Sequence, residues 1–228
     1  MLIVFHDVWI PWTIQKTRQK MFNLRNRLLG NKQLPSKIVG EIIPNNLRYI
    51  DKYQGIMVVE LPPNKRNIFT HRSNSFLYFP YTYLSIQFRS MRHNGKDVYI
   101  FDHLDIGFSD FRLSKTADCV RSLPLSNISG FSVCLGSGSP SLAFNDLKSL
   151  SNAVVTSFWG SSFEMCKSEL AKWENATRKG KGESFVAGIS SRHILPLYSI
   201  SKRGVINSRE KLYNYQPSPS GNGSTGNS

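Results

Sequence analysis

The chain has 228 residues, of which 40% are hydrophobic and 12% aromatic. This apolar content is enough for a folded core and excludes a protein that is disordered throughout. The net charge is +14, and residues 1–100 hold 15 Lys and Arg against 5 Asp and Glu. An excess of this sign attracts polyanions such as nucleic acid, an acidic protein or an anionic membrane surface, or it serves solubility alone.

The cysteines and the lengths of the apolar stretches restrict the compartment and the class of protein that we expect. The three cysteines, Cys119, Cys134 and Cys166, are odd in number, and their spacings match neither a disulfide framework nor a zinc site. We therefore expect a reducing compartment, the cytoplasm. No apolar stretch reaches the 18 or so residues of a membrane span, and no motif predicts a cofactor.

The first elements in chain order are a helix and two short strands. Residues 13–29 have apolar side chains near one face and basic side chains on the others, which predicts a basic amphipathic helix. Such a helix either docks on a sheet through its apolar stripe or lies on a polyanion. Residues 38–43 and 55–61 are short β-like runs, mostly apolar, that predict strands.

The strongest strand pattern follows. Residues 76–88 are rich in aromatic residues and alternate in polarity, and Pro80 divides them because proline cannot donate within a central ladder. Residues 97–101 and 104–108 predict two more strands, and Asn94-Gly95 is a typical hairpin turn. This spacing predicts an antiparallel meander.

The second half changes character. Residues 122–138 are irregular and rich in small residues, and residues 145–159 and 162–177 have helical periodicity. In the second of these helices, Cys166 is spaced for burial together with Leu170 and Trp173.

The C-terminal part is less regular. Residues 179–182 predict a flexible basic linker, and periodicity does not decide between helix and strand for residues 185–200. Residues 216–228 consist of small and polar residues and predict a disordered tail. Taken together, we expect residues 1–215 to form one globular α+β domain, with helices packed on a mainly antiparallel sheet.

One loop carries candidate chemistry. Cys134 follows Asn127 and Gly130 in a segment that leads toward a helix. A partly exposed thiol near a helix N-terminus or a positive charge can act as a nucleophile, and an Asn amide can donate to an oxyanion. The alternative is a buried cysteine in an apolar run, since cysteine is among the most buried residues.

This loop resembles the active-site segment of ubiquitin-conjugating enzymes, in which an Asn precedes a Gly, an apolar residue and the catalytic Cys. It is more similar to the ubiquitin-conjugating-like proteins of bacterial mobile elements, of the PRTRC system protein B type (prokaryotic ubiquitin-conjugating family D). Those proteins share a Pro, an Asn with Ile or Val after it, a Gly and Val-Cys-x-Gly, as in Pro124 to Gly136. Their Phe-(Phe/Trp)-x-Ser-x-Phe element resembles Phe158 to Phe163.

The resemblance implies a ubiquitin-conjugating-like fold over about residues 38–178. It implies Cys134 as a thioester-forming nucleophile, Asn127 as an oxyanion or loop-stabilising residue, and a ubiquitin-like protein or its activating enzyme as partner. It assigns no role to Cys119 or Cys166, which we interpret as core or incidental. The chain departs from the pattern at Leu125-Ser126, where the eukaryotic enzymes have His-Pro.

Two other classes of function remain as alternatives to the enzyme. A non-catalytic module on the same scaffold would bind nucleic acid, with phosphate contacts from Arg25, Arg27, Lys32 and Lys37. A structural or assembly protein of a phage is the third. A metal site is disfavoured, because the candidate ligands are polar residues of a kind typical of a strand end. Those candidates are Asp102, His103, Asp105 and His93.

Overall fold

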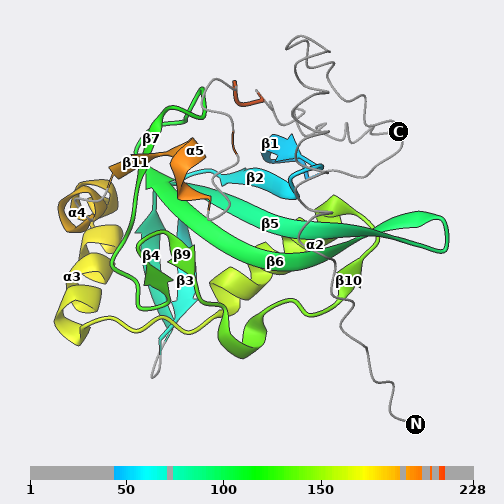
Figure 1. Cartoon of the computed structure of the whole chain (residues 1–228). Helices are drawn as coiled ribbons and strands as arrows, with labels where there is room; N and C mark the ends of the chain where they lie inside the picture. The colour runs from blue at the N-terminus through cyan, green and yellow to red at the C-terminus, as the bar shows by residue number, and fades with distance from the viewer. Residues whose placement is uncertain (1–43, 71–73, 191–193, 202–205, 207–210, 214–228) are drawn as a thin grey trace, which may run out of the picture. The chain divides into compact units, whose positions relative to one another are not determined.

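The computed structural model describes residues 44–70, 74–190, 194–201, 206 and 211–213 (Figure 1). The chain divides into two units, residues 1–40 and 41–228, and every described residue belongs to the second. The predicted helix 13–29, the predicted strand 38–43 and the predicted tail 216–228 lie outside the described residues, as do Arg25, Arg27, Lys32 and Lys37.

A mainly antiparallel sheet with helices confirms the predicted α+β class. Its central strands pair in the order β1 (Leu47–Asp51), β2 (Ile56–Leu61), β5 (Tyr81–His93) and β6 (Lys96–Ser109), all antiparallel. β2 is buried along its whole length, which explains why its sequence is apolar except for Glu60.

The β5–β6 hairpin is the longest pairing in the sheet and runs beyond its neighbours in Figure 1. Asn94 and Gly95 connect the strands with φ angles of 50° and 77°, so both residues of the turn lie in the left-handed region that this hairpin type requires. β6 is one strand, whereas the sequence predicted two runs. The break is only a register shift opposite Gln87 and Phe88, which bends the ladder without ending it.

A second, two-stranded sheet lies between β2 and β5 in the chain. It consists of β3 (Asn64–Phe69) and β4 (Asn74–Phe79), and Pro80 separates β4 from β5 as predicted. The sequence did not predict β3, because most of its residues are polar.

Short strands complete the main sheet. β7 (Cys119–Arg121) and β9 (Ser132–Val133) pair with β6, while β8 (Ile128–Ser129) pairs with β9. β10 (Ala143–Phe144) also pairs with β6, and β11 (Ile194–Pro196) pairs with β7. The segment predicted as irregular therefore holds a small hairpin and one turn of 3-10 helix, η1 (Gly136–Gly138).

The helices follow the cysteine loop. α2 (Leu147–Gly160) begins after Asp146, whose carboxylate accepts from the Ser149 backbone N–H, and it confirms the predicted helix 145–159. α3 (Lys167–Arg178) begins five residues later than predicted, because Phe163 N–H bonds to the Phe69 carbonyl in extended conformation. Cys166 is consequently the exposed N-cap of α3, so the prediction that it is buried was wrong.

Two more helices end the described part. α4 (Gly182–Ile189) begins at Gly182, inside the segment predicted as a linker. The undecided stretch 185–200 contains both kinds of element, since α4 is followed by β11 and by the short helix α5 (Leu197–Ile200).

Alternating residues of β2 and β5 belong to two separate hydrophobic cores. Leu84, Ile86 and their neighbours in β2 pack with α2, while Tyr83 and the intervening residues of β2 pack with α5. Because successive strand residues point to opposite faces, the two cores lie on opposite faces of the sheet. The cysteine loop contributes Val133 and Leu135 to the core that contains α2.

Candidate functional site

The β8–β9 hairpin holds Asn127 and Cys134 side by side. Its strands pair Ile128 with Val133, and the Cys134 backbone N–H donates to the Asn127 carbonyl at 2.8 Å. Gly130 has a φ angle of 65°, a conformation that favours glycine at this turn. Asn127 and Cys134, seven residues apart in the chain, are therefore in direct backbone contact.

The thiol of Cys134 faces outward. Val133 and Leu135 on either side are buried in the core, with 7% of each exposed, whereas Cys134 is exposed. Strand-like alternation explains the difference, because the two apolar neighbours turn inward and the cysteine outward. The alternative of a buried cysteine is excluded by this geometry.

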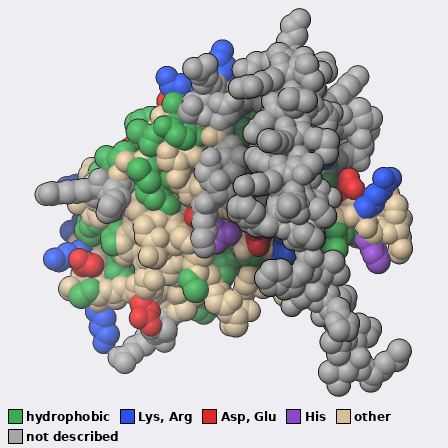
Figure 2. Space-filling view, in the orientation of Figure 1, with side chains coloured by type: hydrophobic (Ala, Val, Ile, Leu, Met, Phe, Trp, Pro, Cys, Tyr) green, Lys and Arg blue, Asp and Glu red, His purple; other side chains and the backbone are tan. Residues whose placement is uncertain are grey.

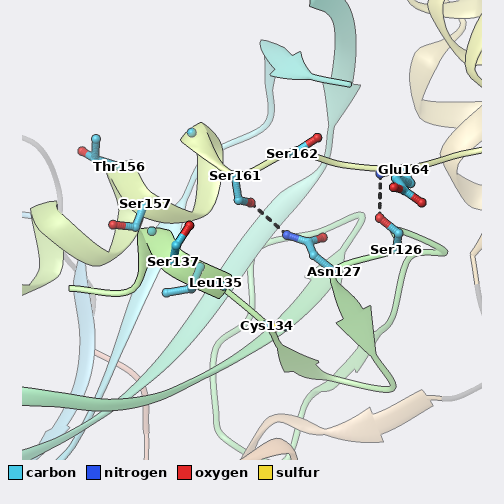
Figure 3. A pocket seen from close by; sticks show the side chains of 13 residues that line it. Ser126, Asn127, Cys134, Leu135, Ser137, Thr156, Ser157, Ser161, Ser162 and Glu164 are labelled. Atoms are coloured by element: carbon cyan, nitrogen blue, oxygen red, sulfur yellow. Dashed lines mark hydrogen bonds between the residues drawn. The ribbon is translucent and has the colours of Figure 1, made fainter. Parts of the chain in front are cut away.

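Cys134 lies in an open pocket of about 690 Å³ (Figure 3). The cysteine loop and η1 form one wall, and the end of α2 with the segment after it forms the other. Most lining residues are glycines or carry hydroxyl groups, and Leu135 adds an apolar side chain. They are Ser126, Asn127, Cys134, Leu135, Gly136, Ser137, Gly138, Thr156, Ser157, Gly160, Ser161, Ser162 and Glu164.

Two hydrogen bonds join the walls of this pocket. The Asn127 Nδ2 donates to Ser161 Oγ at 3.0 Å, and the Glu164 backbone N–H donates to Ser126 Oγ at 2.6 Å (Figure 3). These residues are 34 and 38 positions apart in the chain. The bonds fix the segment after α2 against the cysteine loop.

The Asn127 amide is held at one end only. Its Oδ1 is buried and has no hydrogen-bond partner among the described residues. Ser161 Oγ in turn donates to the Phe158 carbonyl at 2.7 Å. Sequence reasoning gave Ser161 no role, although it stands in the Phe158 to Phe163 element that supports the family resemblance.

The other two cysteines are also exposed. Hydrogen bonds from the Ser168 side chain, and then from the backbone N–H groups of Ser168 and Glu169, lower the pKa of Cys166. The Cys166 Sγ lies 3.2 Å from the Ser168 Oγ. Of our two interpretations for Cys119 and Cys166, core is therefore wrong for both.

A Ser–His–Asp cluster lies elsewhere on the sheet. His103 Nε2 is 3.1 Å from Asp105 Oδ1 and 3.1 Å from Ser132 Oγ, and Gln87 donates to the other carboxylate oxygen. A proton relay needs the serine and the carboxylate on different ring nitrogens. Here a single nitrogen contacts both, so this arrangement does not activate Ser132.

Of the four residues weighed as metal ligands, His103 and Asp105 are in contact, but the four do not form one group. His93 is exposed at the tip of the β5–β6 hairpin, where its ring bonds to the Asn94 amide. Within the part of the chain that the structure describes, no three His, Cys, Asp or Glu side chains are grouped to hold a metal ion.

The positive charge is unevenly distributed. The described residues include 17 of the 29 Lys and Arg and 12 of the 15 Asp and Glu, so they carry +5 of the total of +14. On the face drawn in Figure 2, their basic side chains are scattered among acidic ones. The larger excess, +9, belongs to residues outside the described part.

None of the described helices is both long enough and apolar enough to cross a bilayer. Comparisons of the chain with protein-family models, with curated proteins and with solved structures find no match.

Proposed function

We propose that the protein is a ubiquitin-conjugating-like acyltransferase that carries an acyl group as a thioester on Cys134. The observation that carries this proposal is the exposed Cys134 thiol, which lies in an open pocket that the Asn127 amide also lines. A nucleophile needs access to its substrate, and the flanking buried residues hold this one at a fixed place.

The order of elements gives further support. An antiparallel meander is followed by the cysteine loop and then by helices α2 and α3, and ubiquitin-conjugating enzymes, which the cysteine loop resembles, have the same order. Leu125-Ser126 replaces His-Pro, yet Ser126 has a contact of its own through its bond to Glu164. A ubiquitin-like protein delivered by an activating enzyme is the donor that this proposal implies.

The transfer has two balanced steps. The Cys134 thiolate attacks the carbonyl carbon of a donor thioester, a new C–S bond forms, the donor C–S bond breaks, and the donor sulfur leaves as a thiolate. An amine then attacks the same carbon, the C–N bond forms, the bond to Cys134 breaks to release its thiolate, and the amine proton passes to solvent. In both steps a negative oxygen develops, which the Asn127 Nδ2 can stabilise as a donor.

A synthetic donor tests the proposal without knowledge of the natural one. The full chain is incubated with a soluble peptide that carries a C-terminal glycyl thioester, and the intact mass is measured. We expect one peptide adduct that hydroxylamine removes, in the wild type and in the Cys119→Ser and Cys166→Ser variants, but not in Cys134→Ser. An adduct on all three cysteines alike, or none, contradicts the proposal.

This assay is preferable to alkylation. Because its pKa is lowered, Cys166 is expected to react readily with iodoacetamide whether or not Cys134 is catalytic. Thioester exchange also uses a thiolate, so loading and transfer to an amine are compared in the Cys166→Ser background, where Cys134→Ser should abolish both.

The charge distribution favours nucleic-acid binding as the second candidate. Arg25, Arg27, Lys32 and Lys37 belong to the strongly basic part of the chain outside the described residues. For a random single-stranded oligonucleotide, log Kd should rise steeply with log salt, and each neutralised phosphate contact should reduce the slope by about 1. A flat dependence, or no change after these four residues are replaced by Gln, contradicts this candidate. A phage assembly role remains the third class, and no described feature favours it.

A further inference from the structure

Ser161 makes two bonds that fix the direction of its own hydroxyl group. It follows the last residue of α2, and both its backbone N–H, at 3.2 Å, and its Oγ–H, at 2.7 Å, donate to the Phe158 carbonyl. A serine hydroxyl has one hydrogen, and that hydrogen is used here. Its Oγ can therefore only accept a further bond.

This decides which end of the Asn127 amide faces Ser161. Only the Nδ2 group can donate to Ser161 Oγ, so the amide oxygen must point the other way. That oxygen is buried and unpartnered among the described residues, so no bond at its end holds the orientation. Ser161 is the one hydrogen-bond partner of this side chain within the described part.

We propose that Ser161 is a positioning residue, which orients the Asn127 amide so that its Nδ2 group serves acyl transfer at Cys134. This inference rests on the proposed function. One Nδ2 hydrogen is taken by Ser161, and the other is left to donate to the acyl oxygen. Without the Ser161 hydroxyl, rotation of the amide would present an acceptor oxygen to the developing negative charge, which repels it.

The hydroxyl of Ser161 also caps α2, so a structural role must be separated from a positioning role. Ser162 provides the matched control. It is the next residue, lines the same pocket and has a hydroxyl, but no bond joins it to Asn127. Ser161→Thr keeps the hydroxyl and should restore what Ser161→Ala removes.

The experiment loads the full-length protein with the glycyl thioester peptide and follows its discharge to free lysine. We expect Ser161→Ala to lower kcat for discharge by about 10- to 100-fold, less than the loss of an oxyanion donor itself, with KM for the amine unchanged. Ser161→Thr and Ser162→Ala should discharge like the wild type. In an Asn127→Ala background, Ser161→Ala should add no further loss.

A spectroscopic measurement reports on the amide directly. The two Asn127 Nδ2 hydrogens should give resonances that shift in Ser161→Ala and stay in place in Ser162→Ala. Should Ser161→Ala fail to fold, Ser161→Gly tests the same bond, because it removes the same hydroxyl at a helix end where glycine is well tolerated. It should then slow discharge to a similar extent.

The outcomes separate the two proposals. A wild-type protein that forms no adduct on Cys134 contradicts the proposed function. A wild type that loads normally while Ser161→Ala, or Ser161→Gly in its place, discharges at the same rate overturns only the positioning role. A loss in Ser161→Ala that persists in full in the Asn127→Ala background overturns it as well.

Discussion

Glu60 and Cys134 each lie among polar groups. The groups around Glu60 are buried and charged, whereas those around Cys134 are open to solvent and almost all neutral. The Glu60 carboxylate, on a residue only 7% exposed, accepts from Arg48, from the Tyr83 hydroxyl at 2.9 Å and from Arg112 at 2.9 Å. Tyr83 accepts in turn from the Leu113 backbone N–H at 2.8 Å. Every Glu60 oxygen therefore has a partner inside the fold.

The pocket of Cys134 has the opposite construction. Its lining consists mostly of hydroxyl groups and glycines, with the Cys134 thiol, the Leu135 side chain, the Asn127 amide and the single carboxylate of Glu164, and it is open to solvent. Burial raises the pKa of Tyr83 to about 12, yet Tyr83 has no access to a substrate. A strongly shifted pKa often marks an active site, but here it marks a structural network.

The largest expected loss of stability is that of Glu60→Ala, which disrupts the buried network. Glu60→Ala leaves the Arg48 guanidinium, on a residue only 1% exposed, without its carboxylate partner. Removal of one member of a buried ion pair costs about 3–5 kcal/mol, which we expect as the loss in the free energy of unfolding by urea.

Glu174→Ala is the matched control for this prediction. It breaks the surface pair with Arg178, one helical turn away at 3.4 Å, and should cost about 0.5 kcal/mol or less. Equal losses in the two variants would show that the Glu60 network is no more important than a surface contact.

A smaller effect is expected from Tyr83→Phe, which removes a donor to Glu60 and the acceptor for Leu113 N–H. A buried group left unpaired costs about 1–3 kcal/mol at neutral pH. Because the folded-state pKa of Tyr83 is raised above its ordinary value of 10.0, its contribution is full below pH 10 and decreases from there to about pH 12.

The difference between wild type and Tyr83→Phe isolates this titration. Burial also raises the pKa values of Tyr78 and Tyr99, so their ionisation contributes to the same alkaline loss in both proteins. Unfolding free energies measured from pH 8 to pH 12 should converge as the pH rises. Curves that stay parallel throughout would show that Tyr83 does not titrate in this window.

No short sequence pattern predicts the network around Glu60, whereas short patterns do predict the strands that precede the Cys134 pocket. The meander followed from alternation in β5 and from the Asn94-Gly95 turn, because these patterns act over a few residues. Arg48 and Glu60 are charged residues within strands, and only their pairing across the sheet explains their burial. Polar β3 was missed for the same reason, since its strand exists through pairing with β4.

The open site could be predicted only in part. The sequence left open whether Cys134 is buried, although the alternation of Val133 and Leu135 around it indicates the exposed side once a strand is assumed. The bond from Asn127 to Ser161 connects residues 34 positions apart, so no local pattern predicts it. Cys166 was misplaced because the helical periodicity continued through the extended residues at Phe163.

The smallest expected effect is on stability at the thiol itself. The Cys134 side chain is exposed, and in the described part only its backbone makes a hydrogen bond, so Cys134→Ser should change the free energy of unfolding by about 0.5 kcal/mol or less. The neighbouring Leu135→Ala should cost about 2–5 kcal/mol, because Leu135 is 7% exposed in the core that contains α2. Urea unfolding of both variants measures this contrast between adjacent residues. A loss of more than about 1 kcal/mol in Cys134→Ser would identify the thiol as part of the packing. If Cys134 acts only as the nucleophile, Cys134→Ser should leave the free energy of unfolding nearly unchanged and abolish the peptide adduct.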